Sequence, residues 1–216
     1  MKKVIIICTI VLFVSQLQVN AFGWNLLNKT QSSTAKTSTN STQTVIDISQ
    51  AILNMQNQTA AIDTSVENTF LSIVSQLSPT QESNTIKSKL AAIMSNNTTS
   101  EDEKYDLAYQ IMSNYAANLN TNRTSLISLI SGMSTSEKST LSQSILSLVQ
   151  YGQQYASIAK QGVTTANTLM KTTSNIQNMA HTLTTINSIV SPIKNRAATM
   201  INLAKQFQTI ANYAGI

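Results

Sequence analysis

Apolar and small side chains recur with a heptad spacing through the C-terminal half of the sequence. Steps of four and three residues connect positions that, apart from Thr173 and Asn187, are all apolar or glycine: Leu141, Ile145, Leu148, Gly152, Tyr155, Ala159, Gly162, Ala166, Leu169, Thr173, Ile176, Ala180, Leu183, Asn187 and Val190. A repeat of three and a half residues is typical of a long helix packed lengthwise against other helices. Ser134 and Glu137 form a capping box, which places the start of this helix. We therefore predict a coiled-coil-like helix over about 135–190.

The two glycines inside this helix raise the question of where it is interrupted. Gly152 or Gly162 could mark a break that folds the helix back, since glycine costs about 1 kcal/mol relative to alanine in a helix. The heptad spacing passes through both glycines unshifted, so we predict a continuous helix there. Beyond Pro192 the apolar positions restart one residue out of step, and a kink or a separate last helix is expected.

The rest of the sequence adds further helices to this one. Apolar residues again step by three and four from Val45 to Leu77, which predicts a second long helix over about 44–77. Shorter helices are predicted between the two, beginning near Ser78, where Ser78 would be the N-cap before Pro79, and at a capping box of Ser100 and Glu103. No segment alternates with period two, so no sheet is expected. The predicted fold class is all-α, an elongated antiparallel helical bundle.

The N-terminal segment has the pattern of a signal peptide. Lys2 and Lys3 precede an apolar run from Val4 to Val14, and Val19-Asn20-Ala21 supplies small residues for cleavage. The run is too short for a comfortable membrane span of about 20 residues. We therefore expect residues 1–21 to be removed and the chain to be exported, to a periplasmic, cell-surface or extracellular location. Because the single cysteine, Cys8, leaves with this segment, no disulfide is expected.

Two further segments follow the predicted cleavage site. Residues 22–43 begin with an apolar tip and continue as a Ser/Thr-rich tether with little apolar surface to bury. Residues 44–216 are predicted to form a single helical-bundle domain.

The sequence carries little charge, and what it carries is unevenly placed. Charged residues make up 11% of the chain, and the net charge of +5 falls to +3 without Lys2 and Lys3, too little to indicate nucleic-acid binding. No Asp or Glu follows Glu137, whereas six basic residues do: Lys138, Lys160, Lys171, Lys194, Arg196 and Lys205. Such scattered cations indicate a solvated face or, alternatively, a surface for anionic lipid or an acidic partner.

The residues suited to catalysis or metal binding are few and scattered. His181 is the only histidine, and nothing within one helical turn could orient it as a base or join it as a metal ligand. The acidic residues Glu101, Asp102, Glu103 and Asp106 lie in a predicted first helical turn, where carboxylates complement the helix dipole; the alternative, calcium binding, lacks a suitable loop. We expect no enzyme activity, no cofactor, no metal and no small-molecule substrate.

Two apolar segments are candidate contact sites. One is the mature N-terminus, with Phe22, Trp24, Leu26 and Leu27, which could dock on a protein or membrane or pack onto its own bundle. The other lies between two predicted helices, with Leu126, Ile127, Leu129 and Ile130; it could be a core plug, which we favour, or a tip that enters a membrane.

Together these features predict an exported, non-enzymatic helical bundle that acts through protein–protein interaction. Its partner would be another protein or a second copy of the chain. The alternative is a membrane-active helical protein, such as a component of a pore-forming toxin, which would insert amphipathic helices from several chains.

Overall fold

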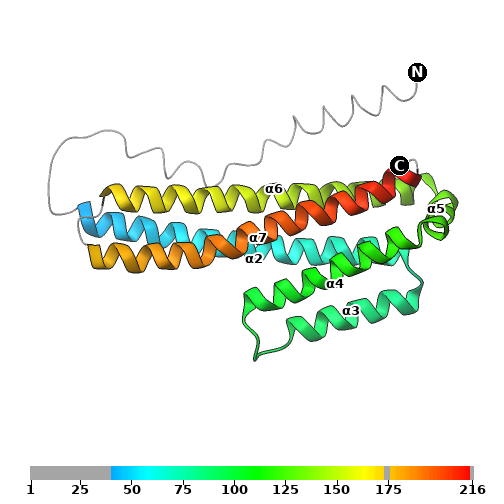
Figure 1. Cartoon of the computed structure of the whole chain (residues 1–216), viewed down its shortest axis with the longest axis horizontal. Coiled ribbons are helices and arrows are strands. Elements are labelled where there is room, and N and C mark those ends of the chain that lie inside the picture. Colours follow the sequence, from blue (N-terminus) through cyan, green and yellow to red (C-terminus); the bar gives the residue numbers. More distant parts are fainter. Residues whose placement is uncertain (1–39, 173–175, 215–216) are drawn as a thin grey trace, which may run out of the picture. The chain divides into compact units, whose positions relative to one another are not determined.

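The computed structural model describes residues 40–172 and 176–214, and within these ranges every long segment is helical (Figure 1). No strand occurs in the described ranges, which hold six helices: α2 (Asn40–Leu77), α3 (Thr80–Met94), α4 (Glu101–Thr121), α5 (Arg123–Gly132), α6 (Thr135–Thr172) and α7 (Ile176–Ala214). The all-α helical-bundle prediction is confirmed.

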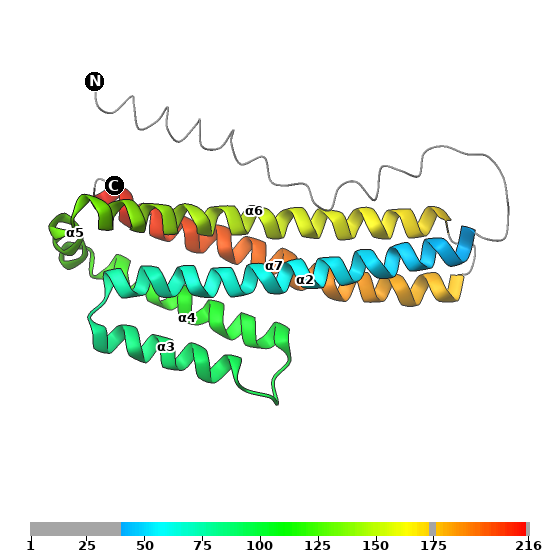
Figure 2. The same ribbon diagram turned by 180° about the vertical axis from the view of Figure 1, so that it is seen from behind.

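Three long helices form the body of the bundle. Helices α2, α6 and α7 have 38, 38 and 39 residues, which corresponds to about 57 Å each at 1.5 Å per residue. They lie side by side in Figures 1 and 2, with α6 antiparallel to both α2 and α7. Helices α3 and α4 form a hairpin that packs beside one half of this body, and α5 leads into α6.

The predicted single helix over about 135–190 is wrong, because α6 ends at Thr172 and α7 begins at Ile176. The helix does pass unbroken through Gly152 and Gly162, as predicted, and the interruption falls later. The sequence there is Thr172-Thr173-Ser174-Asn175, all weak helix formers without a large apolar side chain. Residues 173–175 lie outside the described ranges.

The buried positions of α7 show why the sequence pattern was misleading. They continue backwards from Ile193 through Val190 and Ile186, so Asn187 is exposed and does not belong to the buried stripe. The heptad repeat therefore shifts by one residue between α6 and α7, and not at Pro192 as we predicted. Pro192 is inside α7, and the prediction of a separate last helix is wrong, although α7 changes direction along its length in Figures 1 and 2.

Small residues allow α6 and α7 to approach closely along the length of both helices, more extensively than the other helix pairs. A Cβ atom added to Gly152 would lie 2.9 Å from Cγ1 of Ile201 and 3.4 Å from its backbone nitrogen. At Gly162 the added Cβ would lie only 2.1 Å from Cγ2 of Val190 and 3.2 Å from Sδ of Met55. Packing therefore favours glycine at both positions, although it is a poor helix former.

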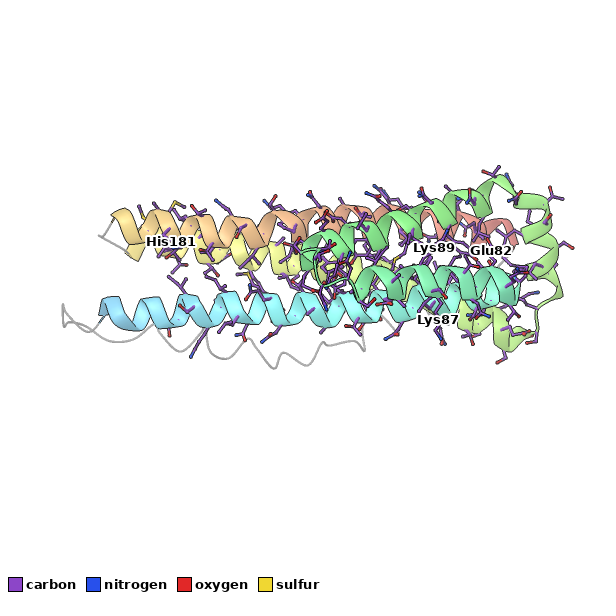
Figure 3. The ribbon with its side chains drawn as sticks, turned by 90° about the horizontal axis from the view of Figure 1, so that it is seen from below. Glu82, Lys87, Lys89 and His181 are labelled. Carbon is purple, nitrogen blue, oxygen red and sulfur yellow. The ribbon has the colours of Figure 1, made fainter. Side chains whose placement is uncertain are left out.

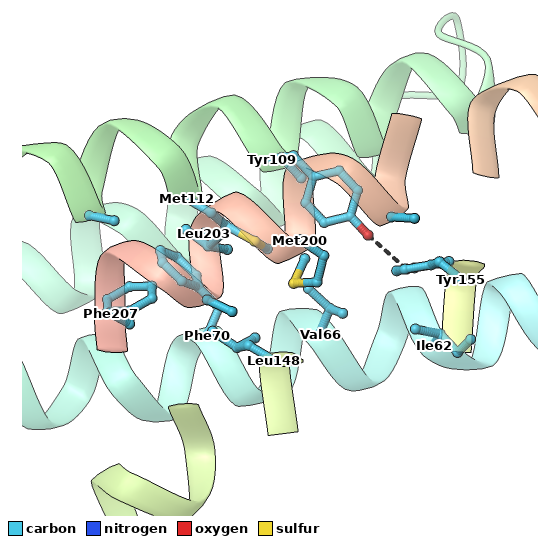
Figure 4. Close-up of a cluster of buried hydrophobic side chains, with 14 of the residues drawn as sticks. Ile62, Val66, Phe70, Tyr109, Met112, Leu148, Tyr155, Met200, Leu203 and Phe207 are labelled. Carbon is cyan, nitrogen blue, oxygen red and sulfur yellow. Dashed lines mark hydrogen bonds between the residues drawn. The ribbon is translucent and has the colours of Figure 1, made fainter. Parts of the chain in front are cut away.

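Large side chains instead fill the space where α2 and α4 meet the α6–α7 pair (Figure 4). Phe70 of α2 lies edge-on to Tyr115 of α4, with ring centroids 5.5 Å apart, and 6.3 Å from the ring of Phe207 of α7. Leu148 and Leu203 complete this cluster from α6 and α7, and both are buried. Complementary burial of large apolar groups is the main stabilising contribution here.

The helix starts agree with the sequence signals in two of three places. The capping box at α6 is complete: the Ser134 backbone N–H donates to the Glu137 carboxylate at 2.7 Å, and the Glu137 N–H donates to the Ser134 hydroxyl at 3.3 Å. Ser100 caps α4 by accepting from the Glu103 N–H. Ser78 does not cap α3, whose N-cap is Pro79; its hydroxyl hydrogen-bonds to the Tyr115 hydroxyl at 2.8 Å instead.

Candidate functional site

A buried polar cluster joins four helices near the middle of the bundle. It consists of Asp63 (α2), Tyr109 (α4), Tyr155 (α6) and Arg196 (α7). One carboxylate oxygen of Asp63 accepts from the Tyr155 hydroxyl at 2.5 Å and from the Tyr109 hydroxyl at 3.0 Å, and the two hydroxyls lie 2.7 Å apart. The other oxygen accepts from Nη1 of Arg196 at 2.7 Å. Figure 4 shows the Tyr109–Tyr155 contact beside the apolar core.

Arg196 also connects the cluster to the start of α4. Its Nη2 donates to the carboxylate of Asp102, which is on the surface, and its guanidinium carbon lies 4.7 Å from the ring centroid of Tyr105. Arg196 itself is only 3% exposed. One carboxylate on each side of the guanidinium thus compensates a charge that would be costly to bury alone.

Burial dominates the acid–base properties of the cluster. It raises the pKa of Asp63 above its ordinary value, an effect that the Arg196 charge and the two tyrosine hydroxyls partly offset. The pKa values of Tyr109 and Tyr155 are raised mainly by burial. Burial, together with the nearby charge of Asp63, raises the pKa of Tyr105 to about 12. The tyrosines therefore stay neutral hydrogen-bond donors throughout the physiological range.

This arrangement is suited to holding helices together. Both oxygens of Asp63 are occupied by protein donors, and Asp63 is 2% exposed, so neither substrate nor solvent meets its carboxylate. Removing one member of a buried ion pair typically costs about 3–5 kcal/mol. The cluster therefore fixes where α2 and α4 attach to the α6–α7 pair.

Sequence reasoning missed the cluster. Arg196 was grouped with the solvated cations of the C-terminal half, which is wrong for this residue. Asp63 follows the buried Ile62 and resembles any charged residue of an amphipathic helix. The available signal was a pair of tyrosines, because a buried tyrosine hydroxyl needs a polar partner. Tyr155 is in the heptad stripe, and Tyr109 follows Ala108, which lies three residues after Tyr105 and four before Met112 in a second apolar stripe.

A second feature is an exposed surface on the side of the α6–α7 pair away from α2, which we call the α6–α7 face. Tyr151 and Tyr155 contact α2, so the opposite edges of the two antiparallel helices point away from it. The face includes four of the large exposed apolar side chains, Leu146, Val163, Met170 and Ile201, which are 37–51% exposed. Its members are the half-buried Val149 and the exposed Leu146, Gln153, Ala156, Lys160, Val163, Asn167 and Met170 of α6, and the exposed Lys194, Ala198, Ile201 and Lys205 of α7.

The α6–α7 face has a second heptad pattern. Its α6 members are separated by alternating steps of three and four residues, like the buried stripe on the same helix. Ile201 joins them across the helix pair, because its side chain reaches Gly152, which lies between Val149 and Ala156 on the helix. All three charged residues of the face are lysines.

The predicted contact residues have different outcomes. Leu126 and Ile130 are buried, Ile127 is half-buried and Leu129 is 45% exposed, so the segment is a short amphipathic helix that contributes two side chains to the core. The other predicted set, Phe22, Trp24, Leu26 and Leu27, lies outside the described residues.

The candidate catalytic and metal-binding residues are not brought together. His181 is exposed near the start of α7, and the other titratable side chains labelled in Figure 3, Glu82, Lys87 and Lys89, lie far from it on α3. Among the described residues, no three His, Cys, Asp or Glu side chains are placed to share a metal ion. Asp102 pairs with Arg196. A shallow hollow on the outer side of α3, bordered by residues such as Asn84 and Ser88, carries no such constellation.

Comparison of the chain with models of known families, with curated proteins and with solved structures finds no match. The fold and the two features described above define the class as an all-α helical bundle with a buried Asp–Tyr–Arg cluster and an exposed apolar and basic face.

Proposed function

We propose that this chain is an exported, non-enzymatic helical bundle that binds another protein through the α6–α7 face. The observation that carries this proposal is the second heptad pattern on α6, with Val163 and Met170 41% and 51% exposed. Exposed apolar side chains aligned along a helix are typical of a surface that packs against another element. The polar cluster would support the face by fixing α2 and α4 on its opposite side.

A photo-crosslinking amino acid placed at Val163 tests the proposal in the cells that produce the chain. The matched control is Gln154, which is also exposed on α6 but points about 180° away around the helix. We expect a discrete crosslinked protein from position 163 and none from position 154. The proposal fails if neither position gives a product, or if both give the same unspecific products.

A second candidate is membrane activity, which the mixture of lysines and apolar side chains on the same face favours. Among the described residues no helix is both long and apolar enough to cross a bilayer. Insertion would therefore require several amphipathic helices acting together. Release of dye from liposomes tests this candidate, and an absence of leakage at every lipid composition would exclude it.

A further inference from the structure

The charges of the described helices are divided between two groups. Residues 40–121, which include α2, α3 and α4, contain eight acidic and three basic residues, a net charge of −5. Residues 122–216 contain one acidic and seven basic residues, a net charge of +6. Because these groups belong to one folded unit, each copy of the chain presents surfaces of opposite sign.

The acidic group contains a patch whose chemistry complements the α6–α7 face. Glu103 and Asp106 are exposed on α4 and flank Leu107, which is 38% exposed. These three residues, which we call the α4 patch, combine an apolar centre with carboxylates. On the α6–α7 face, Lys160 and Lys194 accompany the apolar residues Val163 and Ile201 in the same way.

We propose that the partner of the α6–α7 face is the α4 patch of a second copy of this chain. This inference rests on the proposed function and specifies its partner. In the contact, Leu107 packs among the apolar side chains of the face while Glu103 and Asp106 pair with its lysines. The segment 22–43 of the same chain is a poorer occupant, because its only charged residues, Lys29 and Lys36, are basic.

The geometry has a consequence for the assembly. On α6 the α6–α7 face extends from residue 146 to residue 170, about 36 Å, whereas the α4 patch covers about one helical turn. The two surfaces are different parts of the molecule, so each copy can form two such contacts. These two contacts can close reciprocally between two copies in a two-fold dimer, or continue from copy to copy in a ring or an open chain.

Sedimentation velocity of the full purified chain tests the inference. Over a concentration series at about 20 mM NaCl we expect progressive association, reversed at about 500 mM NaCl, where charges are screened within a few ångströms. The double variant Lys160→Glu/Lys194→Glu and the double variant Glu103→Lys/Asp106→Lys should each weaken association at least about tenfold. All four positions are exposed, and circular dichroism checks that the variants remain folded.

Mixing the two variants provides the decisive comparison. The first variant retains a native α4 patch and the second a native α6–α7 face, so an equimolar mixture should associate again while each variant alone stays monomeric. Equal association of both variants and the unchanged chain would overturn the inference, as would a chain that stays monomeric at low salt throughout the series.

The photo-crosslinker at Val163 separates this inference from the proposed function. A crosslink to α4 of another copy supports both. A crosslink to a different protein, with a monomeric purified chain, overturns the inference and leaves the proposed function standing. Crosslinks to residues 1–39 of the same chain overturn it as well. A last outcome is that the monomer floats with phosphatidylglycerol vesicles and that Val163→Glu abolishes this flotation. The α6–α7 face would then bind lipid, which overturns both the inference and the proposed function.

Discussion

The contact between α6 and α7 differs in kind from the contact of α2 and α4 with that pair. Between α6 and α7, Gly152 and Gly162 bring two helices so close that a single added methyl group would collide with Ile201 or Val190. Between α2, α4 and the pair, long side chains span a wider gap, and an Asp–Tyr–Arg cluster lies in its middle. The first contact depends on shape and the second on both apolar burial and hydrogen-bond partners.

The largest expected effect is a loss of stability at high pH, which arises from the buried tyrosines where α2 and α4 meet the α6–α7 pair. Tyr109 and Tyr155, like Tyr105 and Tyr115, have raised pKa values in the fold; those of Tyr105 and Tyr115 are about 12. The folded state therefore holds protons that the unfolded state releases above pH 10, so stability falls as pH rises beyond 10. We expect cooperative unfolding between about pH 10 and pH 12, with tyrosinate absorbance rising together with the loss of helical circular dichroism. Titration of all tyrosines near pH 10 with the helices intact would contradict this.

Removing one partner of the buried ion pair should have the next largest effect. Arg196→Met leaves the Asp63 carboxylate buried without its cation, which should cost about 3–5 kcal/mol of unfolding free energy in urea titrations. The double variant Asp63→Leu/Arg196→Met should lose less than either single variant, because no buried charge remains and the two tyrosine hydroxyls still bond to each other.

The exposed Asp106→Asn serves as the control for this pair and should change stability by no more than about 0.5 kcal/mol. Additive losses in the double variant would mean that Asp63 and Arg196 do not act as a pair.

The close contact of α6 and α7 should respond to one added methyl group. In Gly162→Ala, overpacking against Val190 should cost about 1–3 kcal/mol, from which the better helix propensity of alanine subtracts about 1 kcal/mol. Gly132→Ala is the matched control, because nothing lies within 4 Å of its added Cβ. Gly162→Ala should lower the thermal midpoint and Gly132→Ala should not. If Gly162→Ala raises the midpoint, the two helices are farther apart than described.

The smallest effect is expected at the start of α6. Ser134→Ala removes the side-chain cap and should cost about 1 kcal/mol. Hydrogen bonds from the Ser134 hydroxyl and backbone N–H lower the pKa of Glu137. A lowered pKa stabilises the fold above its ordinary value of 4.5, and this contribution is lost as pH falls through the folded-state pKa. The loss of unfolding free energy caused by Ser134→Ala, measured by urea unfolding, should therefore become smaller below pH 4. A loss that is the same at every pH would show that the Glu137 carboxylate does not contribute to the cap.

The sequence predicts the helices well because their signals are local. The 3.5-residue spacing identifies the buried faces of α2 and α6, and the capping boxes at Ser100 and Ser134 locate two helix starts. It could not place the end of α6 and the start of α7, because positions such as Leu183 and Val190 fit both registers of the repeat. Whether a helix continues or folds back is decided by what packs against it.

The candidate sites were less accessible to sequence reasoning, because each combines residues from different helices. Asp63 and Arg196 are 133 residues apart, and neither has a local pattern that distinguishes it from a solvated charge. The α6–α7 face was visible in part, as a sparsely basic C-terminal half. Its exposed apolar residues were indistinguishable from core residues until the fold showed which side of α6 is covered.

Native-state hydrogen exchange, measured by mass spectrometry on the unchanged chain and on Arg196→Met, tests most directly whether α2 and α4 are attached to a separately stable α6–α7 pair. The packing described above predicts that Arg196→Met speeds exchange in residues 101–121 of α4 first, while the amides of α6 and α7 around Gly152 and Gly162 remain protected. Simultaneous loss of protection in α4, α6 and α7, or earlier loss in α6 and α7, would contradict it.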